Sequence, residues 1–245
     1  EAPLYLLEVS LREMVRRLVE LPLLYQPGAG WRYSVATDVV GYLVGLISGM
    51  PLDAFLEKKI FEPLGMEDTG FYVPEGKRDR LAALYGPAHG GGVELLDAPF
   101  TSPFTKPPAG LSGGIGLVST ATDYMRFAQM LLNGGELNGA RLLGRKTVEL
   151  MRTNHLPDEL IPIQVRPHTM HGCGFGLGFR VLVHAAQAGR LGSEGEFGWG
   201  GYASTSFMVD PGEGLVGLLL TQLAPSRYYP IRDDFKVLVY QALAD

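Results

Sequence analysis

The sequence contains a single cysteine, Cys173, among its 245 residues. One thiol excludes a disulfide bond within the chain, so the fold must be held by its hydrophobic core. Lysine and arginine form no run longer than a pair such as Arg16-Arg17, and the formal net charge is −5. Since binding to a polyanion requires an excess of positive charge, we expect no nucleic-acid partner.

Long apolar runs are also missing. The longest, VVGYLVGLI and GLVGLLL, fall well short of the roughly 20 residues that a membrane-spanning helix needs, so we expect no membrane partner. The first 21 residues show neither a basic leader nor a small-residue cleavage site. With 46% hydrophobic and 19% charged residues, the composition is that of a globular protein.

Motifs for nucleotide cofactors and metals are absent as well. The sequence has no phosphate-binding loop and no dinucleotide glycine motif after a predicted strand, so no cofactor is expected. His168, His171 and Cys173 lie close together, but a structural zinc site needs four converging ligands and no second cluster exists. We expect no metal, and we expect Cys173 to be a buried, inert thiol without a partner.

The first part of the chain is predicted to be mainly helical. Apolar residues recur at helical spacing over 10–21, 38–48, the run LDAFLEKKIF after Pro51, 120–133 and 145–154. Asp38 is predicted to cap the second of these helices and Gly49 to end it, while Thr120 and Asp123 form a capping-box pattern. Residues 72–116 are rich in glycine and proline, which predicts loops with brief strands beside a cleft.

The last third of the chain favours β-structure. Residues 174–183, 197–211 and 214–223 predict three antiparallel strands, with DPGEG as the turn between the last two. Phe235, Leu238 and Val239 are spaced for a final helix packed on this sheet. The fold class is α/β, more closely α+β, with residues 1–110 forming a helical and loop region and residues 111–245 forming helices and sheet in one catalytic unit.

GLSGG at residues 110–114 fits the G-x-S-x-G pattern of a nucleophile elbow. That pattern has meaning only between a strand and a helix, where a sharp turn exposes the serine. Neither flank of Ser112 fits, so an ordinary glycine-rich loop is favoured.

Two other positions invite a functional interpretation. Gly200 and Gly201 interrupt a strand-like run, which indicates either a bulge or the close approach of a substrate carbonyl to the backbone. Tyr33 stands between a Pro-Gly turn and an apolar helix, where it is either a core residue or a proton carrier at the edge of a pocket.

Several separated segments resemble one family in the expected order. These are YSV after a PG-x-x-WR element, the long run from DVVGYLVG to MEDTGF, GGIGLVSTATDYMRFAQMLLNGG, and FGWGGYASTSFMVDP. The sequence resembles the serine β-lactamase-related esterases, the family VIII carboxylesterases, which share the fold of class C β-lactamases and D,D-peptidases. The resemblance covers nearly all of the chain.

The resemblance implies roles for particular residues. Tyr33 takes the place of the tyrosine in the family's Tyr-x-Asn element, and Val35 stands where the asparagine would be. Trp199-Gly200-Gly201 replaces the Lys-Thr-Gly strand in the form that esterases tend to show, and the backbone NH of Tyr202 becomes an oxyanion donor. Without the amide and ammonium groups, the pocket is more apolar and suits neutral esters.

The family's nucleophile is the serine of a Ser-x-x-Lys motif that precedes the tyrosine, and these 245 residues contain no Ser-x-x-Lys. The chain therefore resembles the carboxy-terminal portion of a longer enzyme, whose missing amino-terminal segment we expect as its partner; alone, the 245 residues are predicted not to fold stably. The leading expectation is a hydrolase of short carboxylic esters. The alternatives are a β-lactamase or D,D-peptidase, acyl transfer to an alcohol or amine, and a noncatalytic binding protein.

Overall fold

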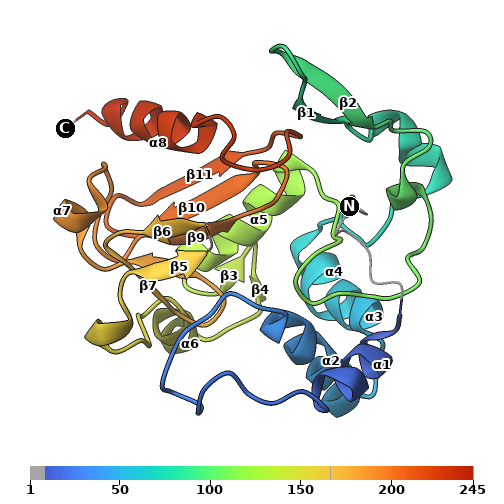
Figure 1. Cartoon of the computed structure of the whole chain (residues 1–245), viewed down its shortest axis with the longest axis horizontal. Coiled ribbons are helices and arrows are strands. Elements are labelled where there is room, and N and C mark those ends of the chain that lie inside the picture. Colours follow the sequence, from blue (N-terminus) through green and yellow to red (C-terminus); the bar gives the residue numbers. More distant parts are fainter. Residues whose placement is uncertain (1–8, 166, 245) are drawn as a thin grey trace.

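A five-stranded antiparallel sheet forms the centre of the computed structural model, which describes residues 9–165 and 167–244 (Figure 1). Its strands run in the order β11-β10-β9-β8-β7. They comprise β7 (Cys173–Phe175), β8 (Arg180–Leu182), β9 (Phe197–Gly200), β10 (Ser206–Asp210) and β11 (Leu215–Leu219). The α+β class expected from the sequence is confirmed.

The remaining elements surround this sheet. The helices are α1 (Leu11–Leu18), α2 (Ala36–Ser48), α3 (Leu52–Leu56), α4 (Glu62–Leu64), α5 (Ala121–Leu132), α6 (Arg145–Met151), α7 (Ala185–Ala188) and α8 (Ile231–Gln241). Three two-stranded ribbons join β1 (Leu84–Pro87) with β2 (Val93–Asp97), β3 (Glu136–Leu137) with β4 (Ala140–Arg141), and β5 (Ile163–Val165) with β6 (His168–Met170). Short 3₁₀ turns cover Glu75–Arg80, Pro103–Thr105 and Asp158–Leu160.

The main core lies between the sheet and α5. Because side chains alternate along a strand, Phe197, Phe207 and Val209 point to one face, where they pack with Met130 and Leu131 of α5. Residues from α4 and from the π-helical turn Glu57–Phe61 join the same core. This core therefore combines residues from both regions that the sequence distinguished.

The opposite face of the sheet carries α8, which is oriented differently from the prediction. Leu238 is 58% exposed, whereas Lys236 is buried against the sheet. Lys236 and Tyr240, one turn apart, both reach acidic groups of the sheet. Polar contacts rather than the apolar periodicity set the rotation of this helix, so the expected packing of Leu238 was wrong.

The sheet also has more strands than predicted. Residues 174–183 form a hairpin, closed by a hydrogen bond from the Gly176 N to the Phe179 O at 2.8 Å. Residues 197–211 form a second hairpin, in which Ser204 adopts a positive φ of 65°. Each stretch that the sequence predicted as one strand turns back on itself, so three expected strands become five.

The helix boundaries are close to those expected, with one correction. Gly49 ends α2 in the left-handed conformation, with φ 69°, as predicted. Asp38 does not cap this helix, because α2 begins at Ala36 and Asp38 lies buried in its first turn. At α5, the Thr120 side chain accepts from the Asp123 N at 3.2 Å, which confirms the predicted cap.

Within the described part of the chain, no single helix is long and apolar enough to cross a bilayer. Only the pair formed by Ala36–Ser48 and Leu52–Leu64 passes by length and composition, and it is bent by 79°.

Candidate active site

The structure brings Tyr33 and Trp199 together. Tyr33 lies in the segment before α2 and Trp199 lies on β9, and their ring centroids are 5.7 Å apart at an interplanar angle of 25°. Phe175 meets Trp199 edge to face at 5.5 Å, and Trp31 contacts Phe175 at 5.1 Å. These aromatic contacts hold the Tyr33 segment against the sheet, while Tyr33 itself remains 53% exposed.

The other residues singled out by the resemblance lie near these two rings in the chain. Val35 immediately precedes α2 and is exposed. Tyr202 is exposed in the turn between β9 and β10, and the Gly201 N donates to the Thr205 O at 2.9 Å across that turn. The two sides of the proposed pocket are therefore a loop rim with Tyr33 and Val35 and a strand end with Trp199.

The glycines of the Trp-Gly-Gly element accommodate an arginine. A Cβ atom at Gly200 would lie 2.8 Å from the Cζ of Arg232, and Arg232 Nη2 donates to the Gly201 O. The pairing of β9 with β10 is regular through Gly200, so the strand has no bulge there. The close approach that the glycines predicted is thus made, on this face, by a side chain of α8.

Ser112 has a structural position, as the sequence favoured. Its side chain is buried, its Oγ donates to Asp38 Oδ1, and it accepts from the N atoms of Gly114 and Ile115 at 3.0 Å each. A Cβ atom at Gly113 would lie 2.1 Å from the Thr37 O. The glycine-rich loop is therefore fastened to the first turn of α2, directly after the Tyr33 segment.

His168 and His171 are exposed, and no group of three or more His, Cys, Asp or Glu within the described ranges is arranged to hold a metal. Cys173 is fully buried, as expected, but it has partners. Its Sγ accepts from Arg180 Nη1 at 3.7 Å and from Arg190 Nη2 at 3.8 Å. The expectation of a thiol without a partner was wrong, because two distant arginines converge on it.

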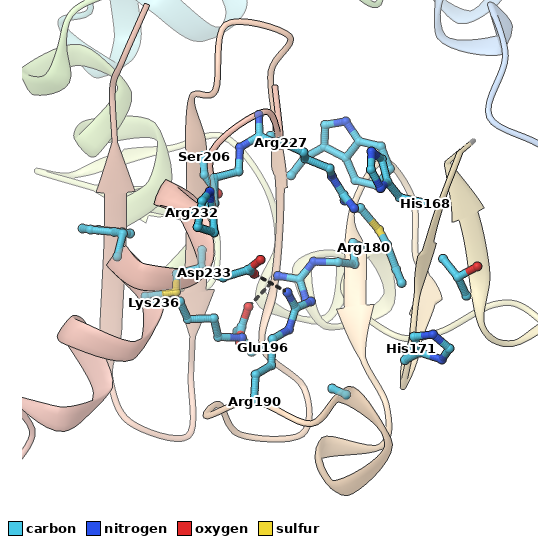
Figure 2. A pocket seen from close by; sticks show the side chains of 18 of the residues that line it. His168, His171, Arg180, Arg190, Glu196, Ser206, Arg227, Arg232, Asp233 and Lys236 are labelled. Carbon is cyan, nitrogen blue, oxygen red and sulfur yellow. Dashed lines mark hydrogen bonds and ion pairs between the residues drawn. The ribbon is translucent and has the colours of Figure 1, made fainter. Parts of the chain in front are cut away.

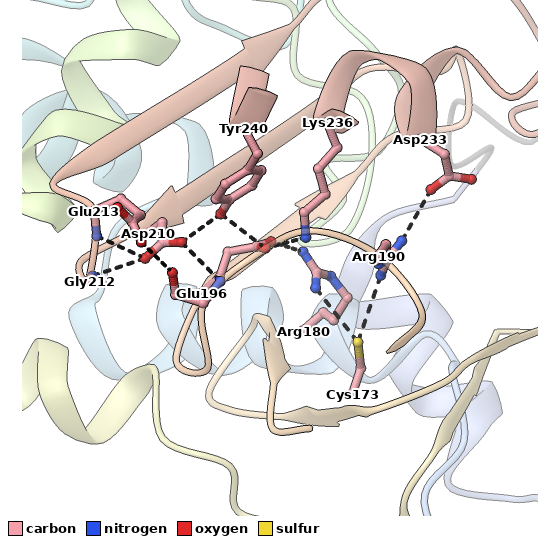
Figure 3. Close-up of polar contacts among 11 residues, drawn as sticks. Cys173, Arg180, Arg190, Glu196, Asp210, Gly212, Glu213, Asp233, Lys236 and Tyr240 are labelled. Atoms are coloured by element: carbon pink, nitrogen blue, oxygen red, sulfur yellow. Dashed lines mark hydrogen bonds and ion pairs between the residues drawn. The ribbon is translucent and has the colours of Figure 1, made fainter. Parts of the chain in front are cut away.

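A buried charge network lies behind β9 (Figure 3). Glu196 is fully buried and accepts from Arg180 at 2.6 Å and from Lys236. Burial alone would raise the pKa of Glu196, but the charges of Arg180 and Lys236 outweigh it and lower that pKa below its ordinary value. Tyr240 donates to Asp210 at 2.6 Å, and burial together with this contact raises the pKa of the tyrosine.

The beta-lactamase family model matches residues 2–241, nearly the whole chain. The chain belongs to the beta-lactamase family. Both the family and the fold that the sequence motifs suggested are thereby confirmed.

Relatives within this family include hydrolases. The chain is 37% identical over 217 residues to Protein Rv1367c of Mycobacterium tuberculosis, covering 85% of this chain and 52% of that protein. It is 31% identical over 242 residues to Esterase EstB of Burkholderia gladioli, covering 89% and 56%. The solved structure of EstCE1, a hydrolase with promiscuous acyltransferase activity, matches with a TM-score of 0.82 at 28% identity, covering 96% of this chain and 63% of that one.

The chain spans about half the length of the curated relatives it matches. The site described above is thus the part of a beta-lactamase-family site that these residues contribute.

Proposed function

We propose that this chain forms part of a serine hydrolase that cleaves short-chain carboxylic esters through an acyl-enzyme, with the nucleophilic serine on a preceding segment. The observation that carries the proposal is the stacking of Tyr33 on Trp199, beside the Gly200-Gly201-Tyr202 strand end. These residues are about 170 positions apart in sequence, and an exposed tyrosine hydroxyl next to a strand end is what proton transfer beside a bound ester requires. The names of EstB and EstCE1 support an ester substrate.

The proposed reaction proceeds in two steps. The serine Oγ attacks the ester carbonyl carbon while its proton passes to a base formed by the lysine of the same segment and Tyr33. The bond from the carbonyl carbon to the alcohol oxygen then breaks, and Tyr33 gives the proton to the departing alcohol. Water repeats the sequence on the acyl-enzyme, which releases the carboxylic acid and restores the serine hydroxyl.

The backbone NH of Tyr202 is proposed to stabilise the oxyanion that forms on the ester carbonyl. This NH and the carbonyl of Gly201 belong to one planar peptide unit. Arg232 donates to that carbonyl, so its guanidinium fixes the orientation of the peptide and polarises the NH toward the oxyanion. We therefore assign Arg232 as a positioning residue.

The proposed pocket is apolar on both sides. Val35 and the ring of Trp199 provide no cation and no amide to bind a carboxylate, which favours neutral esters over β-lactams or peptides ending in a carboxylate. The acyl group would contact the Trp199 ring next to the reacting carbonyl.

Exposed apolar surface supports a partner segment of the same protein. The outer strand β11 pairs with β10 on one side only among the described strands, and Leu220 just beyond it is exposed. On α2, Val40, Leu46 and Ile47 are exposed as well. An open sheet edge beside apolar surface is a hazard for a folded protein. We propose that the segment carrying the serine and lysine covers these surfaces.

Replacement of Tyr33 in the complete protein tests the assignment. We expect Tyr33→Phe to lower kcat for a nitrophenyl ester by about 10²-fold or more, because a proton carrier is lost while the ring still stacks on Trp199. Melting temperature should stay unchanged. An unchanged kcat would remove the role of Tyr33, and faster cleavage of a chromogenic cephalosporin than of the ester would replace the esterase with a β-lactamase.

A further inference from the structure

A cavity of about 430 Å³ lies on the face of the sheet opposite the main core, between α8, the segment 227–230 and the ribbon that carries His168 and His171 (Figure 2). It is distinct from the Tyr33 side of Trp199. Its size is that of a small-molecule site. The proposed ester hydrolysis uses neither this space nor most of the side chains that line it.

The cavity concentrates positive charge. Five cationic and two acidic side chains line it: Arg180, Arg190, Arg227, Arg232 and Lys236, with Glu196 and Asp233. The formal excess is three positive charges, in a chain whose net charge is −5. The two histidines on the rim add to this excess when they are protonated.

The acidic residues are already engaged. Glu196 is shared by Arg180 and Lys236, and Asp233 lies 3.2 Å from Arg190. Within residues 9–165 and 167–244, no carboxylate forms an ion pair with Arg227 or Arg232, and the Nε atoms of Arg190 and Arg232 are buried without a hydrogen-bond partner. The cavity thus presents more guanidinium donors than its own acceptors can satisfy.

Mutual repulsion shows the same imbalance. The pKa of Arg232 is lowered by burial and by the charge of Arg227, and the pKa of Arg227 is lowered by partial burial and by Arg190 and Arg180. Cations held together away from water are costly unless an anion joins them.

We propose that this cavity binds a small polyvalent anion bearing carboxylate or phosphate groups. Arginine forks bind both groups through paired, charge-assisted hydrogen bonds. Arg227 and Arg232 would bind the anion at the mouth, while Tyr228 and Tyr229, which pack edge to face at 4.9 Å, would contact its organic part. The same chemistry has two sources: a free metabolite, or acidic side chains from a part of the complete protein outside these 245 residues.

Titration calorimetry on the complete protein with citrate and with inorganic phosphate tests the free-anion source. We expect one citrate per chain, bound more weakly as salt rises. Arg227→Asn should weaken binding roughly tenfold or more, since it removes a charge-assisted contact. Asparagine tolerates the positive φ of 72° at this position, so the backbone should not change. Arg12→Asn, at an exposed position on α1, makes the same charge change and should leave the affinity unaltered.

The second arm distinguishes an internal anion. If neither citrate nor phosphate binds, a crystal structure of the complete protein should show a carboxylate from outside residues 1–245 bonded to Arg227 or Arg232, and Arg227→Asn should lower the melting temperature more than Arg12→Asn. Absence of citrate and phosphate binding together with absence of such a carboxylate would overturn the proposal. Ester hydrolysis, measured separately, depends on none of these outcomes.

Discussion

Arg232 offers a direct way to perturb the proposed oxyanion site from behind. Its guanidinium packs on Gly200 and donates to the Gly201 O, while the NH of the same peptide unit belongs to Tyr202. We choose Arg232→Met, because methionine keeps much of the side-chain length and removes the charge and the donors.

The expected magnitude follows from the geometry. Loss of a whole oxyanion donor typically costs about 2.7–4 kcal/mol in the transition state. Arg232→Met leaves the Tyr202 NH in place but frees its peptide to rotate and removes its polarisation. We therefore expect about half of that cost, near 1.4–2 kcal/mol, which lowers kcat roughly 10- to 30-fold. KM should change little, because the oxyanion forms only in the transition state.

The assay is steady-state hydrolysis of a nitrophenyl ester by the complete protein. Arg12→Met, at an exposed position on α1, is the matched control and should retain full kcat. Arg232→Lys should recover part of the loss, since an ammonium can also donate to the Gly201 O. A kcat of Arg232→Met within twofold of the unaltered protein would refute the positioning role, even if its melting temperature fell.

Two further predictions concern stability. Glu196→Gln should lower the free energy of unfolding in urea by about 3–5 kcal/mol, because Arg180 and Lys236 would stay buried without their counter-charge; a loss below about 1 kcal/mol would contradict the network. Asp68 contacts Lys77 and Arg80, and hydrogen bonds from Arg80 and Lys77 lower its pKa to about 2, so the Asp68 carboxylate stabilises the fold above pH 4–5 and loses this effect as the pH falls toward 2. The melting-temperature difference between the unaltered protein and Asp68→Asn should shrink over that range, and a difference independent of pH would exclude this linkage.

Local patterns predicted much of the fold. The spacing of apolar residues located α1, α2, α5, α6 and α8, and the DPGEG turn joins β10 to β11 as expected. Asp210 explains that turn, since its side chain accepts from the Gly212 N at 2.9 Å. Such features depend on residues that are close in sequence, which is why the sequence alone contains them.

The features that sequence could not supply depend on distant partners. The apolar spacing of α8 placed Leu238 against the sheet, but the acidic groups that reach Lys236 and Tyr240 lie 30 to 40 residues away along the chain. The glycines at 200 and 201 indicated a close approach, but nothing in the local pattern identified Arg232 as the group that approaches. A charged residue inside an apolar strand, such as Arg180, is the one sequence feature that pointed to the buried network.

Labelling of the complete protein with a fluorophosphonate serine probe, followed by intact-mass and peptide analysis, tests the central proposal most directly. The proposal predicts one adduct per chain, on a serine outside residues 1–245, and parallel loss of ester hydrolysis. Ester hydrolysis that persists without any adduct, or an adduct on a serine within these residues such as Ser112, would contradict it.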